Sequence, residues 1–223
     1  MKILVHGDSN KNFHLKESNI RTYYYADVKH ENNNIDFLRP WFCELTALYY
    51  VLNNYKDDIV GIEQYRRFIL SDNEKEPITE NEILEKLKES DVICGYNRYP
   101  DANGTYIYTW PINNGKKVYF EIYLTVLKEM YGEALYTHFR NFLYGQWHCH
   151  GNLVIGKRKV LEDYFDFLIE TFTVLKTKLN IQNYPRMLEY LSEFLFGAWL
   201  TWNNKKIYWQ PWYNCGRVME SSK

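Results

Sequence analysis

The chain has 223 residues, a formal net charge of -1 and 25% charged residues. This length allows one large domain with a buried core, and the balanced charge argues against a protein that binds nucleic acid. Aromatic residues make up 18% of the chain, and part of this excess is expected in a cleft, because Tyr and Trp seek a partner for their polar end.

The cysteines and the apolar runs indicate a protein of the cytoplasm. Cys43, Cys94, Cys149 and Cys215 form no C-x-x-C pair, so a zinc site is not predicted. The first residues lack the long apolar stretch of a signal peptide, and no apolar run approaches the ~20 residues that cross a bilayer. We therefore expect a cytoplasmic enzyme or binding protein.

The first half of the chain predicts strands that alternate with helices. Residues 2–5 form an apolar run that ends in the turn cluster 7–10, an opening shared by many nucleotide-binding α/β domains and by many unrelated ones. Helices are expected at 40–53, from apolar residues at helical spacing, and at 79–89, from the capping box of Thr79 and Glu82. Further strands are expected at 22–28, 58–65 and 91–94.

The second half begins with an aromatic segment, 96–114, that contains Gly and Pro and has no period. We predict that this segment forms a long ordered loop. Because long loops in compact domains are often functional, we expect its Tyr106 and Trp110 to contact the acceptor, a second substrate. Helices are expected at 118–130, 133–143, 159–178 and 185–199, and strands at 151–155 and 206–209. The alternation predicts a single α/β domain over residues 1–223, with a mainly parallel central sheet flanked by helices.

The densest polar cluster lies at the end of the predicted strand 58–65. Glu63, Gln64 and Tyr65 are followed directly by Arg66 and Arg67. Open α/β sheets bind ligands at the carboxyl ends of their strands, and arginine offers fixed donors to phosphate. Pairing with surface acids is the structural alternative. We predict that these residues bind a phosphate-bearing substrate, called the donor below. His6, Gly7 and Asp8, at the end of the first strand and in the turn after it, are expected to belong to the same site.

A second cluster, 146–152, contains His148, His150 and Asn152. Residues two apart on an extended chain point the same way, so the histidines form one potential metal pair. The spacing indicates no third ligand nearby. Contacts to an acceptor, or structural hydrogen bonds, are therefore favoured over metal binding.

Two glutamates mark the predicted helix 185–199. Glu189 and Glu193 are four residues apart and share one face of the helix. Glu193 lies in an apolar stretch, where burial would raise its pKa and suit it to act as a general base. The alternative is a solvated glutamate or one that pairs with Arg186. We predict Glu193 as the catalytic base and Arg186 as an acceptor-binding residue.

Several familiar motifs are absent. The sequence has no G-x-G-x-x-G, no P-loop, no H-E-x-x-H and no G-x-S-x-G. It also has no Asp-x-Asp, the usual metal-binding motif of GT-A glycosyltransferases. We therefore expect no metal ligands and no cofactor, with cationic side chains neutralising a leaving diphosphate instead.

Residues 43–50, followed by 60–68, resemble a paired helix and strand of the bacterial capsular and exopolysaccharide-synthesis glycosyltransferases, a family long catalogued as a domain of unknown function. Residues 34–35, 152–155 and 186–193 are similar to its later motifs. The resemblance implies a GT-A-like fold and transfer of a hexose, often galactose, from a nucleotide diphosphate sugar. It implies donor-site roles for Glu44 and residues 65–67, and Glu193 matches the family's helix glutamate. Gln64 departs from the family, which usually has His there.

These observations together predict a metal-independent hexosyltransferase. The donor is expected to be a UDP-linked sugar bound by residues of about 1–95, and the acceptor a glycan or lipid-linked glycan bound by about 96–223, with peripheral contact at the membrane face. Two alternatives remain open at this point. One is a non-catalytic carbohydrate-binding or degenerate glycosyltransferase-like protein, and the other is a nucleotide-binding regulatory protein.

Overall fold

The computed structural model describes residues 1–98, 117–145, 147–179, 183 and 185–214. This part of the chain is built around an eight-stranded sheet. Its strands are β1 (Lys2–Gly7), β2 (Arg21–Tyr25), β3 (Ile59–Gln64), β4 (Arg67–Ile69), β5 (Val92–Arg98), β6 (Trp147–Lys157), β7 (Ile207–Gln210) and β8 (Trp212–Asn214).

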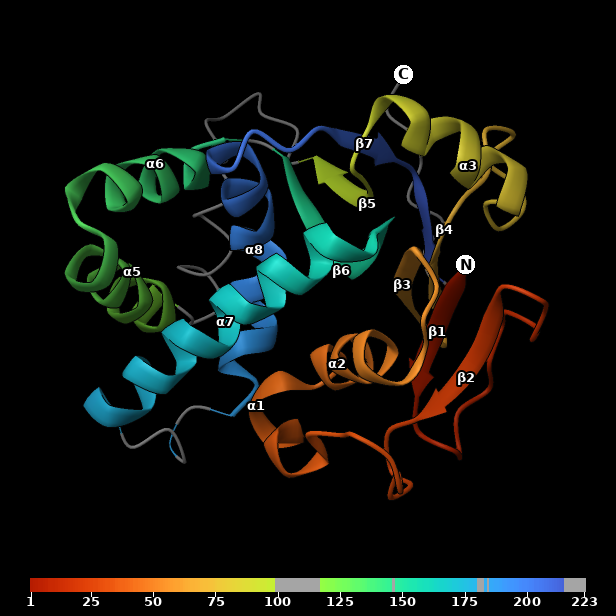
Figure 1. Ribbon diagram of the computed structural model, residues 1–223, viewed down its shortest axis with the longest axis horizontal. Helices are drawn as coiled ribbons and strands as arrows, with labels where there is room; N and C mark the ends of the chain where they lie inside the picture. Colours follow the sequence, from red (N-terminus) through yellow and green to blue (C-terminus); the bar gives the residue numbers. More distant parts are fainter. Residues whose placement is uncertain (99–116, 146, 180–182, 184, 215–223) are drawn as a thin grey trace.

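The sheet has the order β2-β1-β3-β6-β5-β7 (Figure 1). β1 runs parallel to β2 and β3, and β5 runs parallel to β7, whereas β6 is antiparallel to both of its neighbours. β4 turns back antiparallel to β3 and pairs with β8. The expected α/β fold with a central sheet flanked by helices is therefore confirmed, but the sheet is mixed rather than mainly parallel, because β6, β4 and β8 pair antiparallel with their neighbours.

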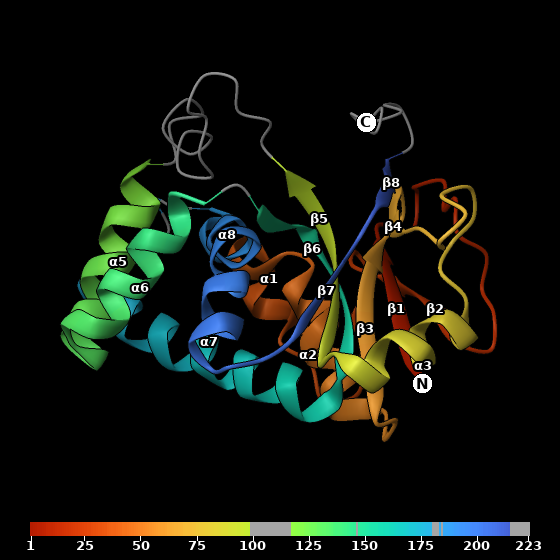
Figure 2. The same ribbon diagram turned by 90° about the horizontal axis from the view of Figure 1, so that it is seen from above.

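Helices cover both faces of the sheet. Figure 2 shows α3 on one face and the other helices on the opposite face. The helices are α1 (Arg39–Phe42), α2 (Leu45–Asn54), α3 (Glu80–Glu89), α5 (Lys117–Tyr131), α6 (Glu133–Leu143), α7 (Arg158–Lys178) and α8 (Met187–Trp202), with a 3-10 turn η1 (Asp36–Leu38). Within the described ranges, no helix combines the length and apolar character needed to cross a bilayer.

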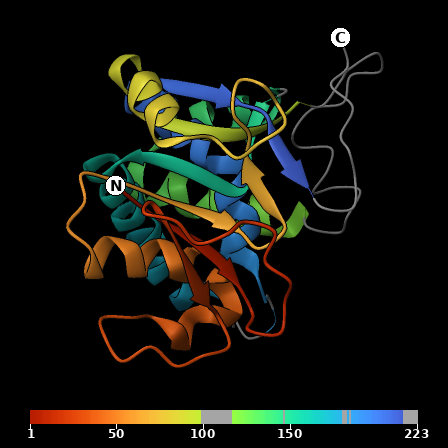
Figure 3. The same ribbon diagram turned by 90° about the vertical axis from the view of Figure 1, so that its right-hand side faces the viewer.

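Strand periodicity decides which side chains reach which face. Val60 and Ile62 of β3 belong to the larger core under α2, α7 and α8, whereas Ile59 packs into the smaller core under α3. Successive strand residues point to opposite faces of the sheet, so Gln64 points to the same face as Ile62, and Glu63 points to the opposite face. Figure 3 shows β1 and β2 running side by side in one direction.

Three predicted elements differ from those observed. The helix expected at 40–53 is divided into α1 and α2, because Cys43 has a φ of 42°, which no α-helix accommodates. β6 begins at Trp147 rather than 151, so the histidine cluster is part of a strand. The strand expected at 58–65 ends at Gln64, and Arg67 opens β4, which was not predicted, so that residues 65–66 form a turn.

Candidate functional site

A cavity of ≈ 540 Å³ lies where the carboxyl ends of β1 and β3 meet the first half of α8. Ten residues that the sequence assigned to a site line it: His6, Asp8, Glu44, Gln64, Tyr65, Arg66, Arg67, His148, Arg186 and Glu193. The structure thus brings both predicted clusters and the predicted base to one place.

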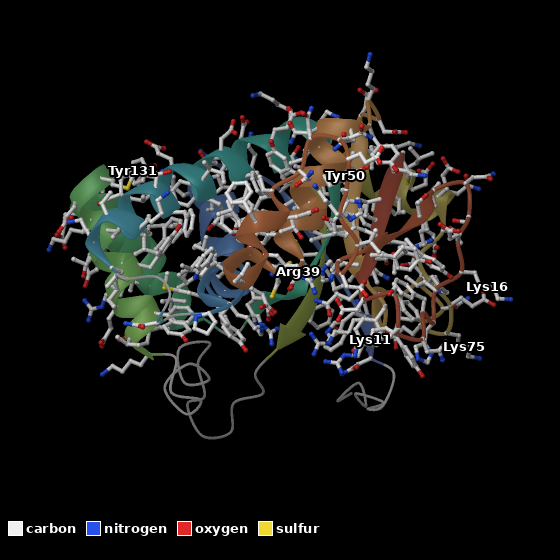
Figure 4. All side chains as sticks on the ribbon, turned by 90° about the horizontal axis from the view of Figure 1, so that it is seen from below. Lys11, Lys16, Arg39, Tyr50, Lys75 and Tyr131 are labelled. Carbon is white, nitrogen blue, oxygen red and sulfur yellow. The ribbon has the colours of Figure 1, made fainter. Side chains whose placement is uncertain are left out.

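One wall of the cavity is basic. Lys11, Arg66 and Arg67 line it, and Lys11 is labelled in Figure 4. Arg66 is exposed, with its guanidinium 5.5 Å from the centre of the Tyr65 ring. Arg67 is half-buried, and its Nε has no hydrogen-bond partner within the described residues. Buried donors are normally satisfied, so this wall offers cationic donors to an anionic ligand.

A second part of the lining, called the acidic wall below, carries three carboxyl groups, those of Glu44, Glu189 and Glu193. Glu189 forms an ion pair with Arg186 on the first turn of α8, through two hydrogen bonds. Within the described part of the chain, neither Glu44 nor Glu193 forms an ion pair. Glu189 is therefore neutralised by an ion pair, whereas Glu44 and Glu193 are not, although all three carboxyl groups line one cavity.

Burial and mutual repulsion raise the pKa of two of these carboxyls. The pKa of Glu193 rises to about 7, mainly through burial and then through the Glu189 charge, against the lowering effects of the Gly151 N–H and of Arg67. Burial, followed by the charges of Glu189 and Glu193, raises the pKa of Glu44 well above its ordinary value. Burial thus disfavours the ionised form of Glu44, and a pKa of about 7 allows Glu193 to exchange a proton near neutral pH.

The two cavity histidines are neutral. Burial lowers the pKa of His6 to about 4 and that of His148 to about 3. His148 stacks on Phe194 of α8, with ring centroids 4.6 Å apart. The His6 Nε2 atom is buried and has no partner within the described residues. These rings provide neutral hydrogen-bonding groups rather than charge.

Asp8 lies at the rim and pairs with a residue that the sequence analysis missed. Arg39, labelled in Figure 4, places its Nη2 atom 2.9 Å from Asp8 Oδ1 and also donates to the Ala26 carbonyl. The carboxylate of Asp8 is thus compensated by protein. Its pairing with Arg39 joins the loop after β1 to the first turn of α1.

Three predicted site residues do not line the cavity. Glu63 points to the other face of the sheet, where its Oε2 accepts a 2.7 Å hydrogen bond from Arg21 Nε in a buried ion pair. Gly7 makes room, since a Cβ there would lie 2.8 Å from the Cβ of Tyr65. Asn152 is buried and donates to Glu44 Oε1 at 3.0 Å.

Three further predictions cannot be placed. Tyr106 and Trp110 lie outside the described residues, and the side chain of His150 is also outside the description. Their acceptor-binding roles stay predictions.

Five lining residues were not predicted as site residues: Lys11, Cys43, Glu189, Tyr190 and Phe194. Two of them left a signal in the sequence. Lys11 directly follows the turn after the first strand, and Glu189 shares a helix face with Glu193. Cys43 left none, because its position depends on the break between α1 and α2.

Among the residues that the structure describes, one group of side chains has metal-ligating atoms within 4.8 Å of one another, namely Cys43, Glu44 and Glu189. Three observations make it a poor divalent metal site. Burial raises the pKa of the Cys43 thiol, which opposes the thiolate that a metal needs. Burial also raises the pKa of the Glu44 carboxyl group, which opposes the carboxylate that a metal binds, and both Glu189 oxygens already accept hydrogen bonds from Arg186.

Comparison with known proteins adds a family and a fold. Residues 8–205 match the model of DUF4422, described as a domain of unknown function. Among curated proteins, no sequence matches the chain. The fold is similar to a solved structure described as the apo form of WbbM, a bifunctional glycosyltransferase, with a TM-score of 0.77 and 16% identity. The similarity covers 97% of this chain and 45% of that protein, so the chain spans less than half of its length.

Proposed function

The chain belongs to the DUF4422 family, and from this premise we propose that it is a glycosyltransferase that transfers a hexose from a nucleotide diphosphate sugar. The observation that carries the proposal is the divided cavity. Cations line one wall, and a carboxyl group with a pKa of about 7 lies on the other. The fold shared with a bifunctional glycosyltransferase supports the same activity class.

The basic wall suits the diphosphate of the donor. Lys11, Arg66 and Arg67 can neutralise the charge that develops on the leaving nucleoside diphosphate. The Nε atom of Arg67 has no hydrogen-bond partner within the described residues, so it remains a donor that a bound anion could satisfy. Neutral His6 at the end of β1, with its buried Nε2, offers a further hydrogen bond to the donor.

Glu193 suits the role of general base. It would accept the proton of an acceptor hydroxyl as that oxygen attacks the anomeric carbon and the nucleoside diphosphate leaves. A base whose pKa lies near the working pH combines sufficient ionised population with sufficient basicity. The Gly151 N–H fixes one side of its carboxylate. Direct displacement of this kind inverts the configuration at the anomeric carbon.

The finer identity of the substrates follows from the resemblance noted in the sequence. We propose a UDP-linked donor, with galactose as the first hexose to test, and a glycan or lipid-linked glycan of a surface polysaccharide as acceptor. Synthesis of such a polymer places the enzyme in the cytoplasm, with peripheral contact at the membrane face. Donor contacts come from residues of about 1–95, whereas Glu193 and Arg186 contribute the acceptor side.

We also propose that catalysis needs no divalent metal. Support comes from the three cations of the basic wall and from the poor ligand properties of Cys43, Glu44 and Glu189. Turnover should be unchanged in excess chelator. Loss of turnover in chelator that Mn²⁺ restores would show that a metal performs the role assigned here to Arg66 and Arg67.

Donor binding provides the first test. A ligand at 100 times its Kd should stabilise the fold by ~2.7 kcal/mol, which a thermal-shift screen detects readily. We expect UDP-hexoses to raise the melting temperature of the wild type and to do so less in Arg67→Ala. If no nucleoside diphosphate sugar shifts the melting temperature at millimolar concentration, the proposed donor class is wrong.

A further inference from the structure

Gln64 occupies the boundary between the basic and the acidic wall of the cavity. Its Oε1 accepts a hydrogen bond from Arg67 Nη1 at 3.3 Å. Its Nε2 donates to the Gly151 carbonyl at 2.7 Å and to Glu44 Oε1 at 3.3 Å. A carboxamide has two N–H donors, so both are used within the protein. The Gln64 amide therefore has no N–H left for a substrate.

The partners of Gln64 fix the orientation of its amide. Arg67 can only donate a hydrogen bond, and the Gly151 carbonyl can only accept one. If the amide were flipped, its NH2 group would face the guanidinium and its oxygen would face the carbonyl. One orientation satisfies all three contacts, so the amide holds a cation on one side and a carboxyl group on the other.

A distortion of β6 supplies one of these partners. The pairing of β5 with β6 shifts register between Cys94 and Tyr96, and at this point Gly151 and Asn152 both have positive φ, 60° and 54°. Bulges of this kind re-aim side chains beside functional sites. A Cβ on Gly151 would lie 3.2 Å from both Gln64 Nε2 and Arg67 Nη1. The glycine thus permits the close approach of both side chains.

The same distortion also contains Asn152, whose side chain contacts Glu44. The Asn152 amide donates to Glu44 Oε1 at 3.0 Å and to the Glu189 carbonyl at 3.3 Å. Glu44 Oε1 therefore accepts hydrogen bonds from two amides, those of Gln64 and Asn152. Neither amide carries charge, so Glu44 is held without a cationic partner.

We propose that Gln64 is a positioning residue, which keeps the Arg67 guanidinium from pairing with Glu44 and so leaves Arg67 available to the donor diphosphate. Opposite charges attract strongly in a site of low dielectric constant. Without the amide between them, Arg67 would move onto Glu44, which would then ionise. The basic wall would lose a cation, and Glu193 would lose a neighbour that favours its ionised form. This inference rests on the proposed function for its kinetic consequences but not for its geometry.

The pKa of Glu193 depends on the charged groups around it, so a change in that pKa can report a movement of Arg67. Glu189 and Arg186 face Glu193 from α8, Arg67 faces it from β4, and Glu44 faces it from the start of α2. Arg67 lowers the pKa of Glu193. If Arg67 moves away in Gln64→Met, the pKa of Glu193 should rise from about 7. A purely structural role for Gln64 would leave that pKa unchanged.

The test combines two variants of Gln64 with a matched control. Gln64→Met removes the polar atoms at similar length, and Gln64→Glu pairs with Arg67 directly. The control is Gln210→Met, because Gln210 also lies at a strand end, is buried, and donates to the Leu70 carbonyl, outside the cavity. Both Gln64 variants should lower kcat/KM for the donor by about tenfold or more, through donor KM, with the control unchanged.

A double variant separates trapping of Arg67 from loss of structure. In Gln64→Met with Glu44→Gln, the carboxyl group that would capture Arg67 is gone. Donor KM should therefore recover by about threefold or more relative to Gln64→Met alone. Effects that simply add would contradict the inference, since residues that act through one another are expected to be non-additive.

Two measurements do not depend on activity. A crystal structure of Gln64→Met should show the Arg67 guanidinium within ion-pair distance of Glu44, and carboxyl NMR titration should show a higher pKa for Glu193. An Arg67 that stays in place, with an unchanged Glu193 pKa, overturns the inference even if the enzyme works. A wild type without transferase activity would overturn the proposed function, and these two measurements would still decide the role of Gln64.

Discussion

Asn152 donates its side-chain amide to Glu44 Oε1 over 3.0 Å, although the two residues lie 108 positions apart in the chain. This contact joins the distorted part of β6 to the junction of α1 and α2. It forms where the predicted donor residues meet the helix that carries the predicted base. The hydrogen bond between the neutral Asn152 amide and the acidic Glu44 side chain thus connects the two halves of the candidate site.

The Glu193→Gln variant tests the proposed base. The amide keeps the shape of the side chain and cannot accept the proton, so kcat should fall by about 10²–10⁴-fold. Donor Kd should change by no more than a few-fold, because the base acts on the acceptor. Glu162→Gln on α7 is the matched control, since its carboxylate pairs with Arg158 outside the cavity. Near-normal turnover in Glu193→Gln would place the base elsewhere.

The raised pKa of Glu193 also predicts how stability depends on pH. Its pKa rises from 4.5 to about 7 on folding, so between these values the folded state holds a proton that the unfolded state has released. The free energy of unfolding therefore falls as pH rises through this window, by on the order of 3 kcal/mol from this group.

In the Glu193→Gln variant, the free energy of unfolding should not show this fall with rising pH. Relative to the wild type, the variant should gain stability between pH 5 and pH 8 in denaturant titrations. Glu162→Gln should follow the wild type. An identical pH dependence in Glu193→Gln and the wild type would show that Glu193 titrates normally in the folded protein.

Arg67→Ala should weaken donor binding. Hydrogen bonds to charged groups contribute about 1.5–3 kcal/mol, so donor Kd should rise by roughly 10- to 100-fold in isothermal titration. Arg67→Lys should recover part of this loss, because the charge returns without the planar fork of donors. Lys88→Ala on α3 is the control, as its ammonium pairs with Glu85 at the surface. An unchanged donor Kd in Arg67→Ala would remove Arg67 from the diphosphate site.

Glu63→Gln should affect stability rather than donor binding. The carboxylate of Glu63 pairs with Arg21 and accepts a hydrogen bond from the Ile69 N–H, all on the face of the sheet opposite the cavity. Loss of one partner of a buried ion pair costs about 3–5 kcal/mol. We expect that loss in chemical denaturation, with donor Kd of the folded protein unchanged. A weaker donor Kd at normal stability would instead return Glu63 to the donor site.

The sequence allowed much of this site to be predicted where short spacing determines geometry. Glu189 and Glu193 share a helix face because they are four residues apart, and Arg66 and Arg67 closely follow the end of a strand that begins with an apolar run. Alternation along β3 also requires Glu63 and Gln64 to face opposite sides. The sequence alone does not indicate which side carries the cavity, and so both were predicted to bind the donor.

The remaining features depend on contacts between distant segments. The break at Cys43 has no local signature that would predict it, and although Gly151 and Asn152 are residue types that tolerate positive φ, their place in a predicted strand gave no reason to expect a distortion there. They are stabilised by partners such as Glu44 and Gln64, which come from other elements. For this reason, Asn152 was predicted to contact the acceptor, whereas its amide is used within the protein.

The release of nucleoside diphosphate from a nucleotide sugar tests the central claim most directly. The wild type should convert UDP-hexose to UDP, slowly with water and faster with a glycan acceptor, and the product should be detected by mass spectrometry. Glu193→Gln should abolish acceptor-dependent release while retaining donor binding, and Glu162→Gln should behave as the wild type. If the wild type binds a nucleotide sugar yet releases no diphosphate with any acceptor, it is a binding protein and the account is contradicted.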